Sequence, residues 1–564
     1  MCGILLNIFR NSNGKIRSKK FSELICNRGP NYFNEIEDVI GNGWNSLILG
    51  SVLWTQGDKT GVQPISDGNG NFLLWNGDVY HGLPNCGETS DSELVFAELV
   101  QHDVLSIIST ICGPYAFIYY DATKSTLWFG RDVVGRHSLL WNINSENLLL
   151  TSVCPRSSDV EEVPNYGIFQ IDLSNPVLDM YFHPWSHLSE DHLKINVKVG
   201  FSIGNKLSHT SFISPYHYDW YNREPERREI EFLSGFTTTS EAAIIFQQLD
   251  LNLPLHNIIQ KMKHLMFQSV EKRIKTKPDY CSNCISSLTI CNHSKFAILF
   301  SGGLDSTILA AIANYVAPQD ESIDLYNVAF ERYGTKSDGF LVPDRKNGYE
   351  SLKELSLLYP QRKWNFVEIN VSQEELGELR SQHIADLIYP LKSILDDSLG
   401  CALWFAARGK GVLNGQPYTS PARIVLLGMG ADEIFGGYSR HRKEFEKQRW
   451  SGLGLQLIEE VNNIGKRNLG RDNRVVTDHG RQPRLPYLDE NLLEFALSLP
   501  PWHRCCLTPN MTAGIGDKIL LRSLAWNLGL RYCTTLPKKA MQFGSKIANP
   551  KEKGHELSAN LVDI

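Results

Sequence analysis

The sequence predicts two folded units of different class: a strand-rich α+β unit followed by an α/β unit with a mostly parallel sheet. Three observations predict this division. The first 150 residues alternate short apolar runs with turn dipeptides. A helical pattern of apolar residues begins at Leu255. After residue 295, compact apolar strands alternate with helical stretches, which is typical of parallel sheets with right-handed crossovers.

The expected elements of the first unit are short. Strands are predicted at 72–75, 115–120 and 127–130, and a helix at 92–102. Residues from about 155 to 250 are polar, aromatic and aperiodic, so we interpret them as linker or insertion. In the second unit we expect the strands 295–300, 325–330, 364–369 and 424–427, and the helices 306–316 and 348–358. The predicted boundaries are 1–190, a linker at 191–254, and 255–564.

Composition favours a soluble, cytoplasmic protein that acts on small molecules. The net charge of −6 gives no reason to expect a nucleic-acid or membrane partner. No apolar run is long enough to span a membrane, and the N-terminus lacks the features of a signal peptide. The twelve cysteines are scattered, so reduced thiols are the simplest interpretation. The oligomeric state is left open.

The strongest local motif is F-S-G-G-L-D-S at 300–306. An apolar strand leads into two glycines, and a helix begins directly afterwards. Such a turn presents bare N–H groups to an anion at a helix N-terminus. A bare phosphate would repel Asp305, so this carboxylate is expected to hold Mg²⁺ against it. The motif lacks GK[ST] and therefore differs from a P-loop.

A second glycine-rich turn, G-M-G-A-D-E at 428–433, follows the strand 424–427. In parallel sheets, ligands bind beyond the carboxyl ends of the strands. The two turns could therefore face one nucleotide, with Asp432 as a second ligand of Mg²⁺.

The N-terminus, Met1-Cys2-Gly3, suggests separate chemistry. After removal of Met1, Cys2 would carry a thiol and a free amine that can act as its own general base. Arg28 could bind a carboxylate, and Asp91 an ammonium. Asn76-Gly77 could form an oxyanion hole. Glutamine matches this arrangement.

These motifs resemble those of glutamine-dependent asparagine synthetases, and more closely those of the asparagine synthetase domain-containing proteins. The resemblance spans about three quarters of the chain. It includes MCGI, RGP, GVQP, NGDVY, SDSE, RDVVGRHSL, SGGLDS, GADEIFGGY, RDN, RLPYLD and DKILLR.

The resemblance implies an N-terminal-nucleophile, class II glutamine amidotransferase domain with αββα layers, and an ATP-pyrophosphatase domain. Ammonia from glutamine would displace AMP from a carboxylate adenylated by ATP. The implied catalytic and glutamine-binding residues are Cys2, Asn76, Gly77, Arg28, Asp78 and Asp91. The implied nucleotide, pyrophosphate and metal residues are Phe300, Ser301, Gly302, Gly303, Asp305, Ser306, Val328, Leu427, Gly428, Asp432, Lys518 and Arg522.

The sequence departs from the family pattern in the second half. Met429 replaces the glutamate of the family's S-G-E-G turn, and Gln482 replaces another glutamate. A thioether cannot accept a proton at neutral pH. Three possibilities follow: aspartate as the acceptor, as in the family; a different carboxylate; or a degenerate member that acts as a binding or scaffold protein.

One further cluster is C-S-N-C-x6-C-N-H, with Cys281, Cys284, Cys291 and His293. The first pair has the spacing of zinc ligands, but the second half is tighter than in common zinc sites. We interpret these residues as cysteines in a mobile connection rather than as a metal site.

Overall fold

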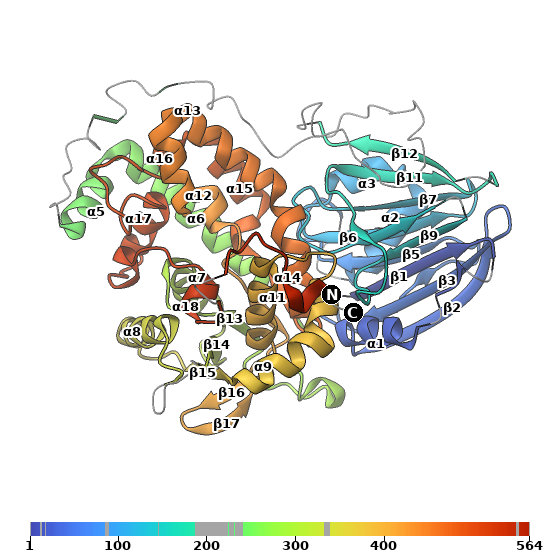
Figure 1. Cartoon of the computed structure of the whole chain (residues 1–564), viewed down its shortest axis with the longest axis horizontal. Helices are drawn as coiled ribbons and strands as arrows, with labels where there is room; N and C mark the ends of the chain where they lie inside the picture. Colours follow the sequence, from blue (N-terminus) through green and yellow to red (C-terminus); the bar gives the residue numbers. More distant parts are fainter. Residues whose placement is uncertain are drawn as a thin grey trace.

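The computed structural model describes residues 2–11, 14–16, 18–84, 89–144, 146–176, 178–186, 224, 230–231, 241–331, 339–548 and 552–562. Figure 1 shows the strand-rich N-terminal unit beside the larger C-terminal unit. Most of the predicted linker 191–254 lies outside the described residues. Its last part is helical, because α5 spans Ala242–Leu251.

Two six-stranded antiparallel sheets form the N-terminal unit. The first has the order β10-β8-β9-β1-β3-β2, and the second the order β12-β11-β7-β6-β5-β4. The strands of the first sheet are β1 (Cys2–Phe9), β2 (Tyr32–Ile40), β3 (Trp44–Val52), β8 (Leu140–Ile143), β9 (Asn147–Thr151) and β10 (Glu161–Glu162). Those of the second are β4 (Ile65–Ser66), β5 (Phe72–Gly77), β6 (Tyr115–Asp121), β7 (Thr126–Arg131), β11 (Gly167–Asp172) and β12 (Asp179–Pro184).

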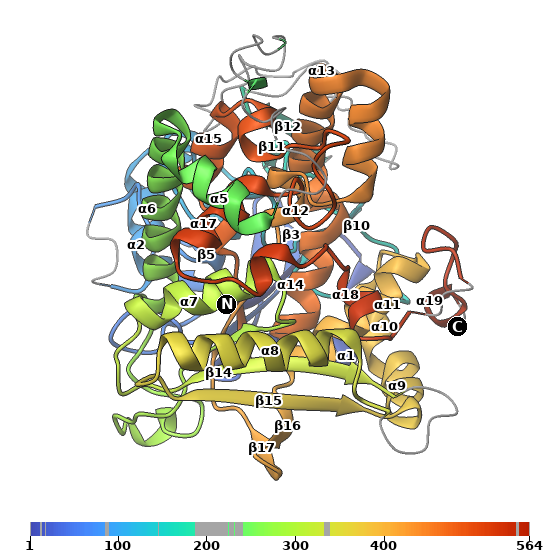
Figure 2. The ribbon, with the colours of Figure 1, turned by 90° about the vertical axis from the view of Figure 1, so that its left-hand side faces the viewer.

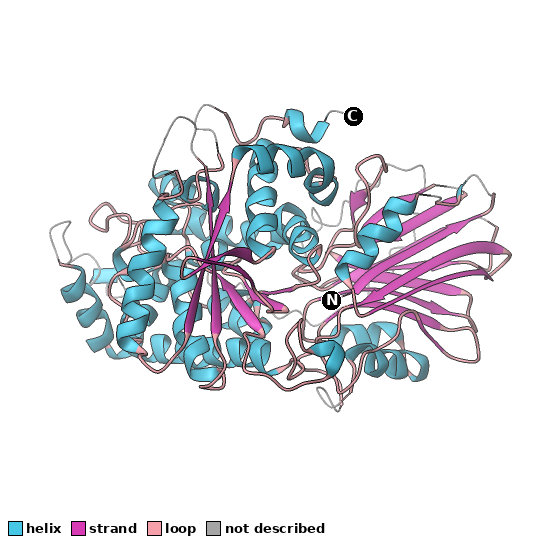
Figure 3. Ribbon diagram, turned by 90° about the horizontal axis from the view of Figure 1, so that it is seen from below, coloured by secondary structure: helices cyan, strands magenta, loops and turns pink. Residues whose placement is uncertain are grey.

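The two sheets lie between helices. One face of β1 carries Ile4, Leu6 and Ile8, which join the apolar core between the sheets. α1 (Lys19–Arg28) packs on β1 and β3, while α2 (Asp91–Gln101) packs on β5. α3 spans Val104–Thr110. This is the predicted αββα arrangement, and Figure 3 shows the stacked strands of this unit.

The start of the region interpreted as linker belongs to these sheets. β10, β11 and β12 lie between residues 161 and 184, so this part of the interpretation is wrong. Polar Gln170 and His183 alternate with the aromatic residues Phe169 and Phe182, which enter the core between the sheets. This alternation was concealed by the short length of the strands.

The C-terminal unit contains one seven-stranded sheet of order β17-β16-β15-β14-β13-β18-β19. The pairs β15-β14, β14-β13, β13-β18 and β18-β19 are parallel, which confirms the predicted α/β class. An antiparallel hairpin that the sequence did not predict extends one edge. The strands are β13 (Phe296–Leu299), β14 (Ile323–Phe330), β15 (Trp364–Val371), β16 (Lys410–Leu413), β17 (Gln416–Thr419), β18 (Ile424–Leu426) and β19 (Gln482–Arg484).

Helices surround this sheet. α7 (Leu304–Val316) and α8 (Pro343–Leu358) lie in the crossovers between β13, β14 and β15, and Figure 2 shows α8 running alongside β14. Others are α6 (Leu253–Lys275), α9 (Gln373–Leu379), α10 (Ala385–Ile388), α11 (Ile394–Ala407), α12 (Ala431–Phe435), α13 (Ser439–Ile464), α14 (Gly470–Thr477), α15 (Glu490–Ser498), α16 (Pro501–Arg504), α17 (Ile519–Asn527), α18 (Met541–Gly544) and α19 (Ala559–Val562). Within the described residues, none of the helices is both long enough and apolar enough to cross a membrane.

Candidate active sites

Cys2 is the first residue of β1 and lies at the edge of the core between the two sheets. Its side chain is buried, and its backbone nitrogen donates a hydrogen bond to Oδ1 of Asn76 at 3.0 Å. Burial raises the pKa of the thiol, and a hydrogen bond from the backbone of Leu53 opposes this effect. Therefore a base is required to make the thiolate at neutral pH.

Two buried polar atoms near this position have no hydrogen-bond partner among the residues that the structure describes. Oδ1 of Asn76 accepts the backbone N–H of Cys2, whereas Nδ2 of the same side chain is a donor without an acceptor. Asp91 accepts a bond from the backbone N–H of Val79 at 2.7 Å, and its Oδ1 is free. Since buried polar groups are normally paired, a free donor and a free acceptor indicate a polar ligand. Such a pair suits an oxyanion and an ammonium.

The environment of Asp91 supports the same interpretation. Burial and the neighbouring Asp78 carboxylate raise the pKa of Asp91 well above its usual range. A ligand ammonium at the free oxygen would favour the charged form. Gly77, at the end of β5, has no room for a side chain, because a Cβ would lie 2.8 Å from the carbonyl oxygen of Pro114.

The structure places Arg28 and Asp78 at the contact between the two units. The guanidinium of Arg28 bonds to Thr477 at 2.6 Å and to Asn473 at 2.9 Å, both on α14. Its Nε lies 3.4 Å from the carbonyl oxygen of Cys2. Arg28 is therefore near the thiol but occupied by α14, and its assignment to a glutamine carboxylate stays a prediction.

Asp78 is fully buried and engaged by the second unit. It accepts a hydrogen bond from Gln482 at 2.5 Å and an ion pair from Arg484 at 3.4 Å. Burial raises the pKa of Asp78, but Arg484 and Gln482 more than offset this and hold it below the usual range. Asp78 thus contributes a charged contact between the units, and its role in binding glutamine also stays a prediction.

The second site lies where the strand order of the parallel sheet reverses. β13 pairs with β14 on one side and with β18 on the other. The carboxyl ends of β13 and β18 lead into the turns 300–303 and 427–430, and a pocket opens between them. This is the position at which open α/β sheets bind ligands.

Ten of the predicted residues line this pocket: Phe300, Ser301, Gly303, Asp305, Ser306, Val328, Gly428, Asp432, Lys518 and Arg522. Gly303 directly precedes α7, so the N–H groups at the N-terminus of this helix face the pocket. Ser301 accepts a hydrogen bond from the N–H of Gly303 at 3.2 Å, which fixes the turn.

Gly302 and Leu427 are not among the pocket-lining residues. Gly302 has φ 73°, and a Cβ there would lie 2.3 Å from the backbone of Asn347. Close packing against α8 and a positive φ thus explain why residue 302 is a glycine. Leu427 donates its backbone N–H to the carbonyl of Arg484 at 3.0 Å, which places it in the sheet beneath the pocket.

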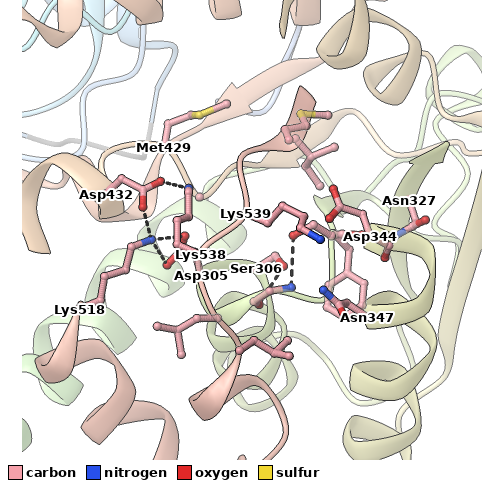
Figure 4. Close-up of a pocket in the computed structure, with 18 of the residues that line it drawn as sticks. Asp305, Ser306, Asn327, Asp344, Asn347, Met429, Asp432, Lys518, Lys538 and Lys539 are labelled. Carbon is pink, nitrogen blue, oxygen red and sulfur yellow. Dashed lines mark hydrogen bonds and ion pairs between the residues drawn. The ribbon is translucent and has the colours of Figure 1, made fainter. Parts of the chain in front are cut away.

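A cluster of opposite charges forms one end of the pocket (Figure 4). Nζ of Lys518 lies 2.7 Å from a carboxylate oxygen of Asp305 and 2.7 Å from one of Asp432. Lys538 also pairs with Asp432. Burial lowers the pKa of Lys518, but the two carboxylates outweigh it and raise the pKa above its usual range. Two carboxylates that face one cation form a donor set suited to Mg²⁺, so these residues fit the predicted metal.

Arg522 lines the pocket but uses its donors within the protein. It bonds to Asp517, to the carbonyl of Thr534 at 2.8 Å and to that of Leu536 at 3.0 Å. These bonds hold the loop that carries Lys538. Its expected contact with pyrophosphate stays a prediction.

Sequence reasoning missed several polar residues of the pocket. Lys538 and Lys539 follow Leu536-Pro537, and the adjacent lysines next to a proline were the only signal. Asp344, near the start of α8, lies at the far end of the pocket from Asp432 (Figure 4). Burial raises the pKa of Asp344 to about 7. No motif marked this residue.

The chain contains a glutamine amidotransferase domain joined to an asparagine synthase domain. The family model for the glutamine amidotransferase domain matches residues 1–198, and that for asparagine synthase matches residues 292–457. The human asparagine synthetase domain-containing protein 1 is 37% identical, with 99% of this chain and 97% of the human protein covered. Similar domain-containing proteins from Drosophila melanogaster and Saccharomyces cerevisiae are 33% and 27% identical over 100% of this chain, and over 100% and 99% of their own lengths.

This chain belongs to the asparagine synthetase domain-containing protein family.

Proposed function

We propose that the chain hydrolyses glutamine at Cys2 and transfers the ammonia to a carboxylate that ATP has activated in the pocket between β13 and β18. The observation that carries the proposal is the pair of free polar atoms beside Cys2, Nδ2 of Asn76 and Oδ1 of Asp91. A domain retained only as a scaffold, without a ligand, would have no need of these buried, unpaired groups.

In the proposed glutaminase reaction, the α-amine of processed Cys2 takes the thiol proton. The sulfur then attacks the side-chain amide of glutamine, and Nδ2 of Asn76 donates to the oxygen that becomes negative. Ammonia leaves with that proton, and water releases glutamate. Asp91 would orient the substrate through its α-ammonium.

In the proposed synthetase reaction, a carboxylate oxygen attacks the α-phosphorus of ATP and pyrophosphate departs toward α7. Ammonia then attacks the acyl carbon, and AMP leaves. Mg²⁺ bound at Asp305 and Asp432 would neutralise phosphate charge. Lys518 and Lys538 supply further positive charge at this end of the pocket.

The acceptor proposed from the family is aspartate, and one observation favours a second candidate. Met429 lines the pocket beside Asp432, where the resemblance implies a glutamate (Figure 4). If a general base there contributes about 10²–10⁴-fold to amide formation, its loss is costly for the family reaction. A different carboxylate, whose reaction does not need this base, would account for the thioether.

The test uses full-length protein whose Met1 has been removed, with Mg-ATP, amide-labelled glutamine and aspartate. Labelled asparagine and pyrophosphate are measured, and Cys2→Ala is the control for glutaminase-dependent transfer. Product that disappears in Cys2→Ala but returns with added ammonia supports the proposal with aspartate. Glutamate release without asparagine or pyrophosphate rules out aspartate, and a panel of other carboxylates is then tested for pyrophosphate release. Absence of both glutamate and pyrophosphate contradicts the proposal.

A further inference from the structure

The segment between α6 and β13 gathers four potential metal ligands that neither candidate active site uses. A ligand atom of each of Cys281, Cys284, Cys291 and His293 lies within 4.8 Å of all the others. The chain folds back to bring these residues together, which their interpretation as cysteines in a mobile connection did not anticipate. Cys281 is fully buried, Cys284 and Cys291 are half-buried, and His293 is exposed.

The backbone of this segment forms a tight knuckle. The N–H groups of Cys284 and Ile285 bond to the carbonyl of Cys281 at 3.2 and 3.0 Å. A 3₁₀ turn at Ile285–Ser287 follows, and Leu288 then adopts a left-handed conformation with φ 51°. The turn reverses the chain and returns Cys291 and His293 to the first two cysteines. The short spacing of the second pair is thus compatible with convergence on one point.

The two nitrogen–sulfur distances from His293 to Cys281 and Cys284 match a tetrahedral site. A zinc ion with Zn–S near about 2.3 Å and Zn–N near about 2.05 Å separates a sulfur from a nitrogen by about 3.6 Å. Nδ1 of His293 lies 3.5 Å from Sγ of Cys281 and 3.6 Å from Sγ of Cys284.

We propose that Cys281, Cys284, Cys291 and His293 bind one structural zinc ion. Three thiolates and one imidazole form a closed, four-ligand N/S set, which favours zinc over the hard cations that prefer oxygen. The site would carry one net negative charge. The buried guanidinium of Arg423 interacts electrostatically with Cys281, and its Nη1 has no hydrogen-bond partner within the described part of the chain, so it offers the compensating charge.

The zinc site fastens the second unit to the glutaminase unit. Tyr280, the residue before the first ligand, contacts Trp54 with ring centroids 5.9 Å apart. Arg423 donates to Asn31 at 2.9 Å, and Asn31 in turn accepts the N–H of Trp54 at 3.0 Å. Trp54 directly follows Leu53, whose backbone bonds to the thiol of Cys2. The metal thus holds a loop that supports the nucleophile, although it lies outside both active sites.

The experiment measures metal in the untagged, full-length protein purified without chelators. Elemental analysis should find about one zinc per chain. Cys284→Ser and His293→Ala should lose it, whereas His293→Cys should retain it as a four-thiolate site. Cys112→Ser is the matched control, because Cys112 is also half-buried but lies outside the cluster. Replacement of zinc by Co²⁺ should give the visible absorption of tetrahedral cobalt thiolate, and this readout does not depend on any variant folding.

Hydrogen exchange gives a second readout, which reports on the contact between the zinc-binding segment and the glutaminase unit. Exchange around Tyr280 and Trp54 should rise in Cys284→Ser and stay at the wild-type level in Cys112→Ser. Wild-type protein without metal and without the cobalt spectrum overturns the proposal, as does a disulfide within the cluster. Zinc that persists unchanged in both Cys284→Ser and His293→Ala overturns it as well. None of these outcomes depends on glutaminase or synthetase activity.

Discussion

Lys518 stands between two carboxylates in a strained backbone conformation, and both features can be tested together. It has φ 54° and ψ 36° at the start of α17, a left-handed region that costs a residue with a side chain roughly 1–2 kcal/mol. Its side chain is 3% exposed, and the ammonium pairs with Asp305 and Asp432. The ion pairs therefore hold a conformation that the backbone alone disfavours.

The expected loss of stability in Lys518→Ala follows from the two carboxylates that remain after the ammonium is removed. Removing one partner of a buried ion pair costs about 3–5 kcal/mol, because it leaves a buried charge without compensation. Asp432 retains Lys538, and the side chain of Asp305 is 20% exposed, so we expect the lower end, about 3 kcal/mol. In Lys518→Gly the left-handed strain is relieved, so this variant should be about 1 kcal/mol more stable than Lys518→Ala.

The assay is calorimetric unfolding of the second unit without nucleotide or Mg²⁺. Lys518→Ala should lower its Tm by roughly 5–10 °C, and Lys518→Gly by less. Lys553→Ala removes an exposed pair with Glu556 and should change stability by less than about 1 kcal/mol. The lysines hold the pKa of Asp432 below its usual range, and the carboxylates hold the pKa of Lys518 above its own, so the stability difference should not vary near neutral pH. A Tm of Lys518→Ala equal to that of the control refutes the charge argument, and equal stability of the Ala and Gly variants refutes the strain argument.

Three other predictions concern the first unit. Asn76→Ala removes the free Nδ2 donor, so kcat for glutamine hydrolysis should fall by about 10²–10³ with little change in KM, measured as glutamate release. Burial lowers the pKa of His137 to about 3, and its Nδ1 donates to the carbonyl of Asn76. The contribution of neutral His137 to the free energy of unfolding is therefore full above about pH 6.5 and is lost as the pH falls toward about 3. His137→Gln should reduce the slope of unfolding free energy against pH in this range by about 1.4 kcal/mol per pH unit, measured by unfolding at several pH values. Arg136→Met strands the buried Asp132 and the interdomain partner Glu490, so it should cost about 3–5 kcal/mol and separate the unfolding transitions of the two units in calorimetry; a single transition at the wild-type temperature would contradict it.

Local patterns were sufficient to predict most elements that position the two sites. The apolar run before Ser301 forms β13, and the helix expected from Ser306 is α7. Their signals lie within a few residues of each other, so one window of sequence contains them. The glycine-rich turn after β18 was found for the same reason. Their meeting at one pocket followed from the rule that parallel strands end at the same edge.

Contacts between distant segments could not be predicted in this way. The direction of the Arg28 guanidinium depends on Asn473 and Thr477, which lie more than four hundred residues later. Lys538 reaches Asp432 from a loop without periodicity, held in place by the bonds of Arg522. Each of these placements is decided by tertiary packing, for which a single sequence carries no local signal.

The four-ligand cluster shows a different limit. Its spacing was judged against zinc motifs in which two pairs are far apart, and by that standard Cys291 and His293 are too close together. The left-handed residue Leu288 and the 3₁₀ turn before it remove the difficulty, because they reverse the chain within six residues of Cys284. A backbone reversal of this kind depends on φ, which the identity of a leucine does not predict.

Arg484 is the residue through which the two proposed reactions can be linked physically. Its guanidinium pairs with Asp78 of the glutaminase unit and donates to the carbonyl of Thr276 at 2.7 Å, at the start of the cysteine-rich segment. Its own carbonyl accepts the N–H of Leu427 at 3.0 Å, next to the turn that carries Met429. A shift of Asp78 on glutamine binding would therefore act on β19 and the synthetase pocket through one buried side chain. Gln482 suits this arrangement, because its amide donates to Asp78, whereas a glutamate there would repel the same carboxylate and compete for Arg484.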